Sequence, residues 1–372
     1  MKIDSERSEP KYLQLKHIMK RYLDQEHYQA DQKIPSETEL IERFDVSRGT
    51  VRQTLAELVN EGVIYKKQGL GSFFSGKTEN EKHEQSGLIG VITPAMFSYI
   101  YPQILQGIND IVHQKRYNVV LSDSEGNSDN EYPHLEQLLA RGIEGLLFEP
   151  AGSPERFQKT RVFELIKSLT IPVVFMDWAL DNSNVSYVSL DDVEGGFRAT
   201  NYLIEQGHRR IAYIYMANHV PGILRYTGYR KALEAHNIPF DARLERSRPI
   251  FKWLRADYAY TLTTELLTLG DERPTALFFF NDEAAMRGYA AIREAGLRIP
   301  DDISVMGFDD SQLASLAEVP MTSVIHPKHQ IGKWAAEMLF EQLESAGRNT
   351  PRQMILHPSI AIRDSVAALL NF

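Results

Sequence analysis

Two arginines, Arg48 and Arg52, lie four residues apart in the segment SRGTVRQTL. On a helix, side chains at this spacing share one face, where two like charges destabilise the helix by roughly 0.2–0.5 kcal/mol. That loss is offset if both guanidinium groups contact phosphates or the acceptor atoms of guanine. The pair therefore indicates contact with a polyanion, provided that the neighbouring residues form a helix that presents it.

A small helical domain surrounds the arginine pair. Residues 11–29 carry apolar side chains at helical spacing. Ser36, with Glu39 three residues later, has the sequence signature of a capping box at the start of a second helix. Ser47 caps a third helix, whose apolar stripe forces the two arginines onto the opposite side. Residues 63–74 then predict two short strands around a Gly-Leu-Gly turn, which is a β-hairpin.

This order of elements is that of a winged helix-turn-helix, in which the start of the third helix enters the major groove of DNA. The alternative is a small helical domain whose arginines are solvated and bind nothing. Taken singly, an arginine on a helix is more often a solvated surface residue than a DNA contact. Caps, turn and basic hairpin together favour DNA binding. The predicted DNA-binding residues are Ser36, Glu37, Ser47, Arg48, Gly49, Thr50, Arg52, Lys66, Lys67, Gln68 and Gly69.

The segment KIPSETELIERFDVSRGTVRQTLAELVNEGVIYKKQGLGSFF resembles the DNA-binding domain of GntR-type bacterial transcription regulators, over nearly all of residues 10–75. The resemblance implies that the two arginines, Thr50 and the wing glycine Gly69 contact DNA. One position departs from the family, since many members have an arginine where this chain has Thr38. We therefore expect the DNA contact that this arginine makes in the family to be absent or different here.

Charge is distributed unevenly along the 372 residues, which carry a net charge of −9. Residues 1–80 contain 13 Lys+Arg and 13 Asp+Glu, so the remainder carries the whole excess of acid. The chain has no cysteine, which excludes disulfides and thiolate chemistry. The N-terminal segment lacks the apolar stretch of a secretory signal, and no apolar run approaches membrane-spanning length. We expect a cytoplasmic protein with no membrane partner.

A polar, aperiodic stretch, SGKTENEKHEQS, divides the chain. We expect a winged helix-turn-helix domain at 1–76, a linker at 77–86, and an effector-binding and dimerisation domain at 87–372.

Apolar runs alternate with helical stretches throughout that last domain, and these runs of Val, Ile and Phe indicate strands buried on both faces of a parallel sheet. The domain is too long for one such sheet. Two lobes are therefore expected, roughly 87–180 plus 326–350, and 181–325 plus 351–372.

Polar residues collect at the ends of the predicted strands, where open α/β sheets bind their ligands. Carboxylates and amides exchange hydrogen bonds with hydroxyl groups, an arginine can bridge two of them, and a tryptophan can cover the apolar face of a sugar ring. These carboxylate, amide, arginine and aromatic side chains together are suited to binding a polyol. Two tyrosines that could line the mouth of such a site could also simply pack. The predicted effector-binding residues are Tyr99, Tyr101, Glu149, Asp177, Trp178, Arg225, Asn281 and Asp309.

A structural role is expected for some carboxylates near these strand ends. Asp282 and Asp310 head helices, so we expect helix capping ahead of ligand contact there. Asn281 and Asp309 lie one residue earlier, where either role is equally expected. Neighbouring carboxylates can form an acid–base pair, but adjacent ones on a chain usually point in different directions, which disfavours a hydrolase.

Neither cofactor nor metal is predicted. No dinucleotide-binding glycine motif follows a strand, and no Walker A motif is present. His326 and His329 have the spacing of metal ligands, but no third ligand accompanies them, so we expect surface histidines. We predict no catalytic residue.

The second domain also resembles a known family. The segments IGVITPAMFSYIYPQILQGIND, RYTGYRKAL, FFFNDEAAMRGYAAIREAGLRIPDDISVMGFDD and TSVIHPKHQIGKWAAEML are similar to the effector domain of LacI/GalR-type repressors, over essentially all of 88–365. The resemblance implies a periplasmic-binding-protein-like fold of two lobes. It also implies that Arg225, Asn281 and Asp309 bind the effector, that the aromatic near Trp178 stacks on it, and that helix 328–345 contributes to dimerisation.

The resemblance of the two domains to GntR-type and LacI/GalR-type regulators implies a homodimeric transcriptional repressor of carbohydrate utilisation genes. It would bind a palindromic operator in double-stranded DNA and be released by a monosaccharide, for which L-arabinose is the best candidate. The stretch KTENEKHEQS lacks the minor-groove hinge helix of LacI/GalR proteins. Alternatives are a sugar that acts as corepressor, a soluble sugar-binding protein, which leaves residues 10–75 unexplained, and a sugar-modifying enzyme.

Overall fold

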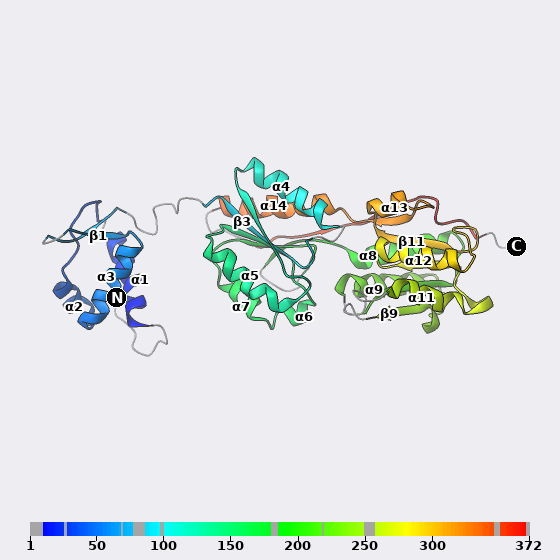
Figure 1. Cartoon of the computed structure of the whole chain (residues 1–372), viewed down its shortest axis with the longest axis horizontal. Coiled ribbons are helices and arrows are strands. Elements are labelled where there is room, and N and C mark those ends of the chain that lie inside the picture. Colours follow the sequence, from blue (N-terminus) through cyan, green and yellow to red (C-terminus); the bar gives the residue numbers. More distant parts are fainter. Residues whose placement is uncertain are drawn as a thin grey trace. The chain divides into compact units, whose positions relative to one another are not determined.

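The computed structural model describes residues 10–25, 28–67, 70–76, 86–96, 100–179, 185–217, 219–248, 257–345 and 350–369. The chain forms two compact units, Met1–Ser86 and Gly87–Phe372, so the division falls at the end of the expected linker (Figure 1). The predicted site residues Gln68, Gly69 and Tyr99, and linker positions 77–85, lie outside the described residues.

The first unit is a winged helix-turn-helix. It consists of helices α1 (Lys11–Gln25), α2 (Glu37–Phe44) and α3 (Arg48–Asn60), followed by the antiparallel strands β1 (Ile64–Lys67) and β2 (Gly71–Phe74). The apolar faces that the sequence predicts meet in one core. Packing in this core stabilises the helices, which are too short to be stable in isolation. Buried members of this core are Leu15, Met19, Leu23, Leu40, Phe44, Val51, Leu55, Leu58, Val63, Ile64 and Phe74.

The second unit contains two six-stranded sheets, one in each lobe. The sheet of the first lobe has the order β13-β7-β6-β5-β3-β4, and all of its strand pairs are parallel. Its strands are β3 (Leu88–Thr93), β4 (Asn118–Asp123), β5 (Gly145–Phe148), β6 (Val173–Met176), β7 (Ser186–Leu190) and β13 (Gln353–Leu356).

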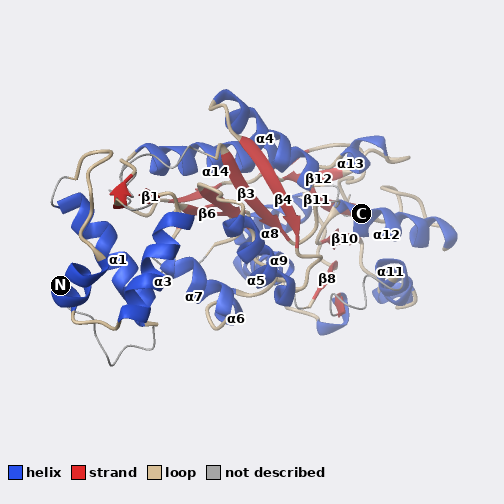
Figure 2. Cartoon of the chain, turned by 60° about the vertical axis from the view of Figure 1, so that its left-hand side comes forward, coloured by secondary structure: helices blue, strands red, loops and turns tan. Residues whose placement is uncertain are grey.

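Helices cover both faces of this first sheet, which is why its strands read as continuous apolar runs. Helices α4 (Tyr101–Gln114) and α14 (Lys328–Glu344) pack on one face. Helices α5 (Ser128–Ala140) and α7 (Arg161–Ser168) pack on the other, with the short α6 (Pro154–Phe157). Figure 2 shows the sheet strands between α4 and α14 above and α5 and α7 below.

The sheet of the second lobe has the order β14-β12-β11-β10-β8-β9, with only β14 antiparallel to its neighbour among the described strands. Its strands are β8 (Ile211–Met216), β9 (Glu245–Arg248), β10 (Ala276–Phe279), β11 (Ser304–Asp309), β12 (Thr322–Ile325) and β14 (Ser359–Ala361). Its helices are α8 (Asp192–Glu205), α9 (Val220–Ala235), α11 (Tyr258–Leu267), α12 (Asp282–Glu294) and α13 (Gln312–Leu316), with 3₁₀ turns η1 (Ala242–Leu244) and η2 (Gly270–Glu272).

The lobe boundaries expected from the sequence are wrong at two crossings. Strand β7 pairs with β6, and β13 pairs with β7, so both belong to the first lobe. The chain therefore changes lobe after Leu190 and after Leu356, rather than near 180 and 350. Neither short strand carries a sequence pattern that says which sheet it joins, because pairing partners are set by the tertiary fold. No helix in the described part of the chain is long and apolar enough to cross a bilayer.

Candidate functional site

Two caps fix the starts of the helices that carry the predicted DNA-binding residues. Ser36 accepts a hydrogen bond from the backbone N–H of Glu39 at 3.4 Å, while the Glu39 carboxylate accepts one from the Ser36 N–H at 2.7 Å. This is the predicted capping box, and its hydrogen bonds lower the pKa of Glu39. Ser47 caps α3, where its Oγ accepts from the Thr50 N–H at 3.2 Å.

The arginine pair lies on the solvent side of α3, opposite the buried Val51 and Leu55. The Arg48 side chain is 77% exposed, and its Nε lies 3.7 Å from Oε2 of Glu37 on α2. An exposed ion pair of this kind contributes little, about 0–1 kcal/mol. Arg48 can therefore exchange Glu37 for a phosphate at small cost.

The hairpin presents two further cations, Lys66 and Lys67, both exposed. The ammonium of Lys67 lies 4.9 Å from the ring centre of Phe73 and 5.4 Å from that of Tyr65. The two rings stack on each other at 5.8 Å, so they form a platform that orients the lysine. The recognition helix α3 and the wing, which is the β1–β2 hairpin, thus both carry positive charge, as expected of a DNA-binding domain.

In the second unit, the ends of the first-lobe strands hold a buried hydrogen-bonded pair. Tyr101 donates to Oε1 of Glu149 at 2.7 Å, and the two side chains are 5% and 8% exposed. Burial and the nearby charge of Asp177 raise the pKa of Glu149 well above its ordinary value. Oε2 of Glu149 and Oγ1 of Thr93, at the end of β3, are buried and have no hydrogen-bond partner among the described residues.

Asp177, which follows β6, contacts the second lobe through His326. Nε2 of His326 lies 2.9 and 3.0 Å from the two carboxylate oxygens of Asp177. Burial alone would raise the pKa of Asp177, but the charge and hydrogen bond of His326 lower it. The expectation of a surface histidine is wrong for His326, which is 3% exposed because the connection from β12 to α14 passes between the lobes.

Arg225 is the charged centre of the second-lobe site and is 4% exposed. Its Nε donates to Asp192 at 2.7 Å, its Nη1 donates to the Phe280 carbonyl, and Nη1 lies 3.6 Å from Oδ1 of Asp309. The guanidinium lies 3.5 Å from the ring centre of Phe308. Burial opposes its charge, but the two carboxylates raise the pKa of Arg225 above its ordinary value, so it stays protonated.

His219 lies at the N-cap of α9 and is not among the predicted effector-binding residues. Burial and the charge of Arg225 lower its pKa to about 4, so the imidazole is neutral at pH 7. Its Nδ1 is buried and has no hydrogen-bond partner in the described structure. The charges of Asp309 and Asp177 oppose this lowering of its pKa. Its position just after β8 is the signal that could have identified it.

The capping roles expected at the helix starts are assigned differently by the structure. Asn281, not Asp282, caps α12, with its Oδ1 accepting from the Ala284 N–H at 2.8 Å. Asp310 forms an ion pair with Arg363 at 2.7 Å instead of capping α13. Asp309 and Asp310 do point to different partners, as expected from the sequence.

Trp178 lies in the core of the first lobe and is 6% exposed. Its ring contacts Phe157 and Phe175, at centroid distances of 5.2 and 5.3 Å, and its N–H donates to the Gly152 carbonyl at 3.1 Å. These contacts are with the core rather than with another predicted effector residue. The structure therefore brings together Tyr101, Glu149, Asp177, Arg225 and Asp309, and leaves Trp178 in the packing beneath them.

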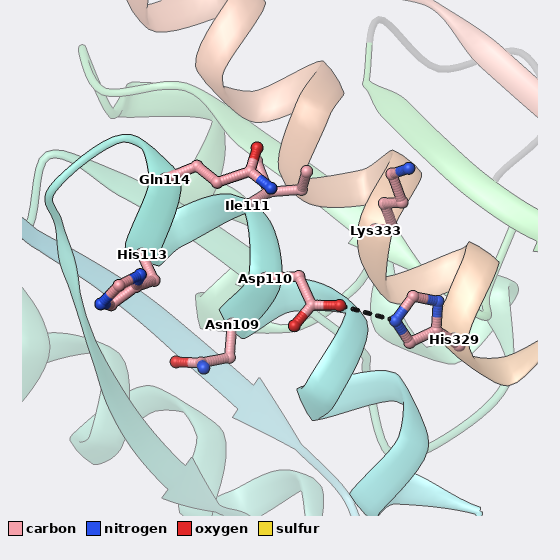
Figure 3. Close-up of a pocket in the computed structure, with 7 residues that line it drawn as sticks. All are labelled: Asn109, Asp110, Ile111, His113, Gln114, His329 and Lys333. Atoms are coloured by element: carbon pink, nitrogen blue, oxygen red, sulfur yellow. Dashed lines mark hydrogen bonds and ion pairs between the residues drawn. The ribbon is translucent and has the colours of Figure 1, made fainter.

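A separate, polar surface hollow lies between α4 and α14 of the first lobe (Figure 3). Within it, Nε2 of His329 lies 2.8 Å from Oδ2 of Asp110. The His329 side chain is 38% exposed, so this histidine is half-buried at the surface. The hollow is lined by Asn109, Asp110, Ile111, His113, Gln114, His329 and Lys333, which are helix residues and not strand-end residues.

Several buried polar atoms near the strand ends have no hydrogen-bond partner among the described residues. Thr93, Glu149, His219 and His326 each keep such an atom, and they come from both lobes. Buried polar groups are normally paired, so these four suit a small ligand with several hydroxyl groups. Together with the winged helix, the site defines a class: DNA-binding regulators that carry a two-lobed ligand-binding domain.

Comparisons with known proteins agree with this class. The family model for bacterial regulatory proteins of the gntR family matches residues 11–74, and the one for periplasmic binding protein-like domains matches residues 200–366. The arabinose metabolism transcriptional repressor of Geobacillus stearothermophilus is 34% identical over 97% of this chain and 98% of its own length. The protein of the same name from Halalkalibacterium halodurans is 29% identical over 90% and 91%.

Solved structures show the same fold. The complex of the transcriptional regulator CelR with cellobiose aligns with a TM-score of 0.65 and 24% identity, over 86% of this chain and 91% of that one. A LacI family regulator from Enterococcus faecium with bound ribose aligns at 0.64 and 26%, over 76% and 100%. The chain belongs to the family of arabinose metabolism transcriptional repressors, with a GntR-type DNA-binding domain and a LacI/GalR-like effector domain.

Proposed function

We propose that this protein represses carbohydrate utilisation genes and leaves its operator when it binds a monosaccharide, with L-arabinose as the first candidate. The observation that carries the proposal is the set of buried polar atoms on Thr93, Glu149, His219 and His326 that have no hydrogen-bond partner within the described part of the chain. A sugar brings donors and acceptors to both lobes at once. The names of the similar repressors support arabinose as the first sugar to test.

The proposed mechanism couples sugar binding to the arrangement of a homodimer. Two copies place their winged helices on the half-sites of a palindrome in the cytoplasm, and α14 contributes to the dimer contact. The sugar favours the closed arrangement of the two lobes, and it can shift the protein only by as much as it prefers that arrangement. A coupling of about 1–3 kcal/mol changes operator affinity by about 5–150-fold. A sugar that acts as a corepressor would instead raise the affinity for the operator.

A thermal-shift screen of the purified full chain against monosaccharides tests the proposal directly. A sugar at 100 times its dissociation constant should stabilise the protein by about 2.7 kcal/mol. Titration of a duplex selected from random sequence by the wild-type protein then gives the sign, because an inducer lowers duplex affinity and a corepressor raises it. A protein that binds no sugar, or that consumes one, contradicts the proposal.

Two substitutions should separate the two activities. Arg48→Ala removes an exposed contact of the recognition helix, so duplex affinity should fall about 10-fold or more while sugar affinity is kept. Asp309→Ala should lose sugar affinity and keep duplex affinity, which gives a repressor that sugar cannot release. Fluorescence anisotropy and calorimetry measure the two affinities. If each variant loses both activities, the assignment of separate sites is wrong.

A further inference from the structure

The turn that carries Asp309 has an unusual backbone. Asp309 and Asp310 have φ angles of +98° and +48°, in a region that residues with a side chain rarely adopt. Such conformations persist when the surrounding structure fixes them, and they cluster at functional sites. The turn Asp309–Ser311 is held on both sides by side chains from other elements.

Lys328 holds the carbonyl side of the turn. Its ammonium donates to the Asp309 carbonyl, and it lies 3.4 Å from the carbonyl oxygen of Asp310 and 3.2 Å from that of His326. The side chain is buried, with 4% of the residue exposed. An ammonium has three donors and can serve three carbonyls at once. Lys328 begins α14, which packs on the first lobe, while the turn belongs to the second.

Asp282 and Ser323 hold the amide side of the same turn. Oδ2 of Asp282 accepts from the Ser311 N–H at 2.7 Å, and its Oδ1 accepts from the Ser323 hydroxyl at 2.6 Å. The Ser323 hydroxyl in turn accepts from the Asp310 N–H at 3.0 Å. The carboxylate reaches this place across Gly307, where a Cβ would lie 2.2 Å from Oδ1 of Asp282.

We infer that Lys328, Asp282 and Ser323, here called the turn clamp, are positioning residues that set the direction of the Asp309 carboxylate and thereby the choice of sugar. Asp309 is itself 3.6 Å from Arg225, so a small rotation of the turn changes which hydroxyl the pair can reach. The clamp residues act through Asp309 and not by touching the sugar. This inference rests on the proposed function, since it concerns the same site.

The test measures selectivity in the full chain. Calorimetry gives the affinities for L-arabinose and D-ribose, two pentoses that differ in the directions of their hydroxyl groups; if another sugar of the panel binds more tightly, it replaces L-arabinose. Lys328→Met keeps the apolar stem and removes the donors. It should weaken binding of the preferred sugar by roughly 10-fold or more and reduce the ratio of the two affinities. Asp282→Asn should reduce that ratio in the same direction.

Lys333→Met is the matched control, because Lys333 lies on the same helix with a side chain that is 42% exposed. It should leave both affinities and their ratio unchanged. A loss of folding lowers both affinities in parallel, so an unchanged ratio in Lys328→Met and Asp282→Asn overturns the inference. If Lys328→Met does not fold, as judged by circular dichroism, Asp282→Asn and Ser323→Ala decide it. Failure of the wild-type chain to bind any sugar contradicts the proposed function instead.

Discussion

Buried charges of the second unit differ in whether they have a partner of opposite sign. Asp192 and Arg225 form an ion pair at 2.7 Å, and Asp177 is hydrogen-bonded to His326 at 2.9 Å. Glu131 has no such partner among the described residues: it is fully buried, accepts only the Ala151 N–H at 2.5 Å, and keeps Oε2 unpaired. An unpaired buried carboxylate is costly when charged, and burial raises the pKa of Glu131 to about 7.

Glu131→Gln should therefore stabilise the protein in a pH-dependent way. Because the folded-state pKa lies above the ordinary value of 4.5, the wild-type carboxyl favours folding when protonated, and this contribution is lost as pH rises through about 7. The amide keeps an acceptor for the Ala151 N–H and carries no charge. The gain in unfolding free energy should be small at pH 5 and reach about 2–3 kcal/mol at pH 8.

Urea denaturation at the two pH values measures this gain. Glu136→Gln on the same helix is the control, since Glu136 is exposed, and it should show no such rise between pH 5 and pH 8. A Glu131→Gln gain that is equal at both pH values would mean that the carboxyl does not titrate in this range.

Some site residues could be predicted from the sequence and others could not. Asp309 stands out because it ends an apolar strand, where a polar residue is expected either to contact a ligand or to cap a helix. Arg225 lies within α9, and its role is implied by the resemblance to LacI/GalR-type repressors. The sequence predicts His326 on the surface, whereas the structure buries it, because a single histidine carries no pattern that shows whether tertiary packing will cover it. Asp282 was assigned to capping, since its true partners, Ser323 and Ser311, lie on segments that only the folded sheet brings near.

At the scale of elements, two helix pairs approach closely at glycines. In the second lobe, a Cβ at Gly196 on α8 would lie 2.0 Å from the Arg225 carbonyl, and one at Gly228 on α9 would lie 2.0 Å from the Val193 carbonyl. Helices α4 and α14 meet in the same way at Gly107 and Gly332. The first of these contacts holds Asp192 and Arg225 together, because each helix carries one of the two.

Gly228→Ala should destabilise the protein, although alanine normally stabilises a helix interior by roughly 1 kcal/mol relative to glycine. The added methyl must push α9 away from α8, and such overpacking costs about 1–3 kcal/mol. Sugar affinity should fall as well, because Arg225 moves away from Asp192. Denaturation and calorimetry measure the two effects. Glu234→Ala, on the exposed side of α9, should change neither, and a more stable Gly228→Ala variant would show that the helices have room to adjust.

Element boundaries were predictable where strands are long and apolar. Two of the apolar runs, LIGVIT at 88–93 and NVVLSD at 118–123, coincide with β3 and β4. The caps at Ser36 and Ser47 are where the sequence places them. Strand β7, with the sequence SYVSL, was not identified, because two serines interrupt its apolar run. Hydrogen bonding to β6 makes it a strand, and that is a property of the assembled sheet.

For the whole molecule, each unit has its own apolar core, so we expect each to unfold as a separate cooperative transition in a calorimetric scan of the full chain. A ligand raises the unfolding temperature only of the unit that binds it. A sugar at 100 times its dissociation constant should add about 2.7 kcal/mol to the larger transition, a shift of several degrees, and leave the smaller one in place. The selected duplex should raise the unfolding temperature of the smaller, DNA-binding unit. A single transition that responds to both ligands would contradict independent folding, and would mean that the coupling between sugar and DNA travels through a shared folded core.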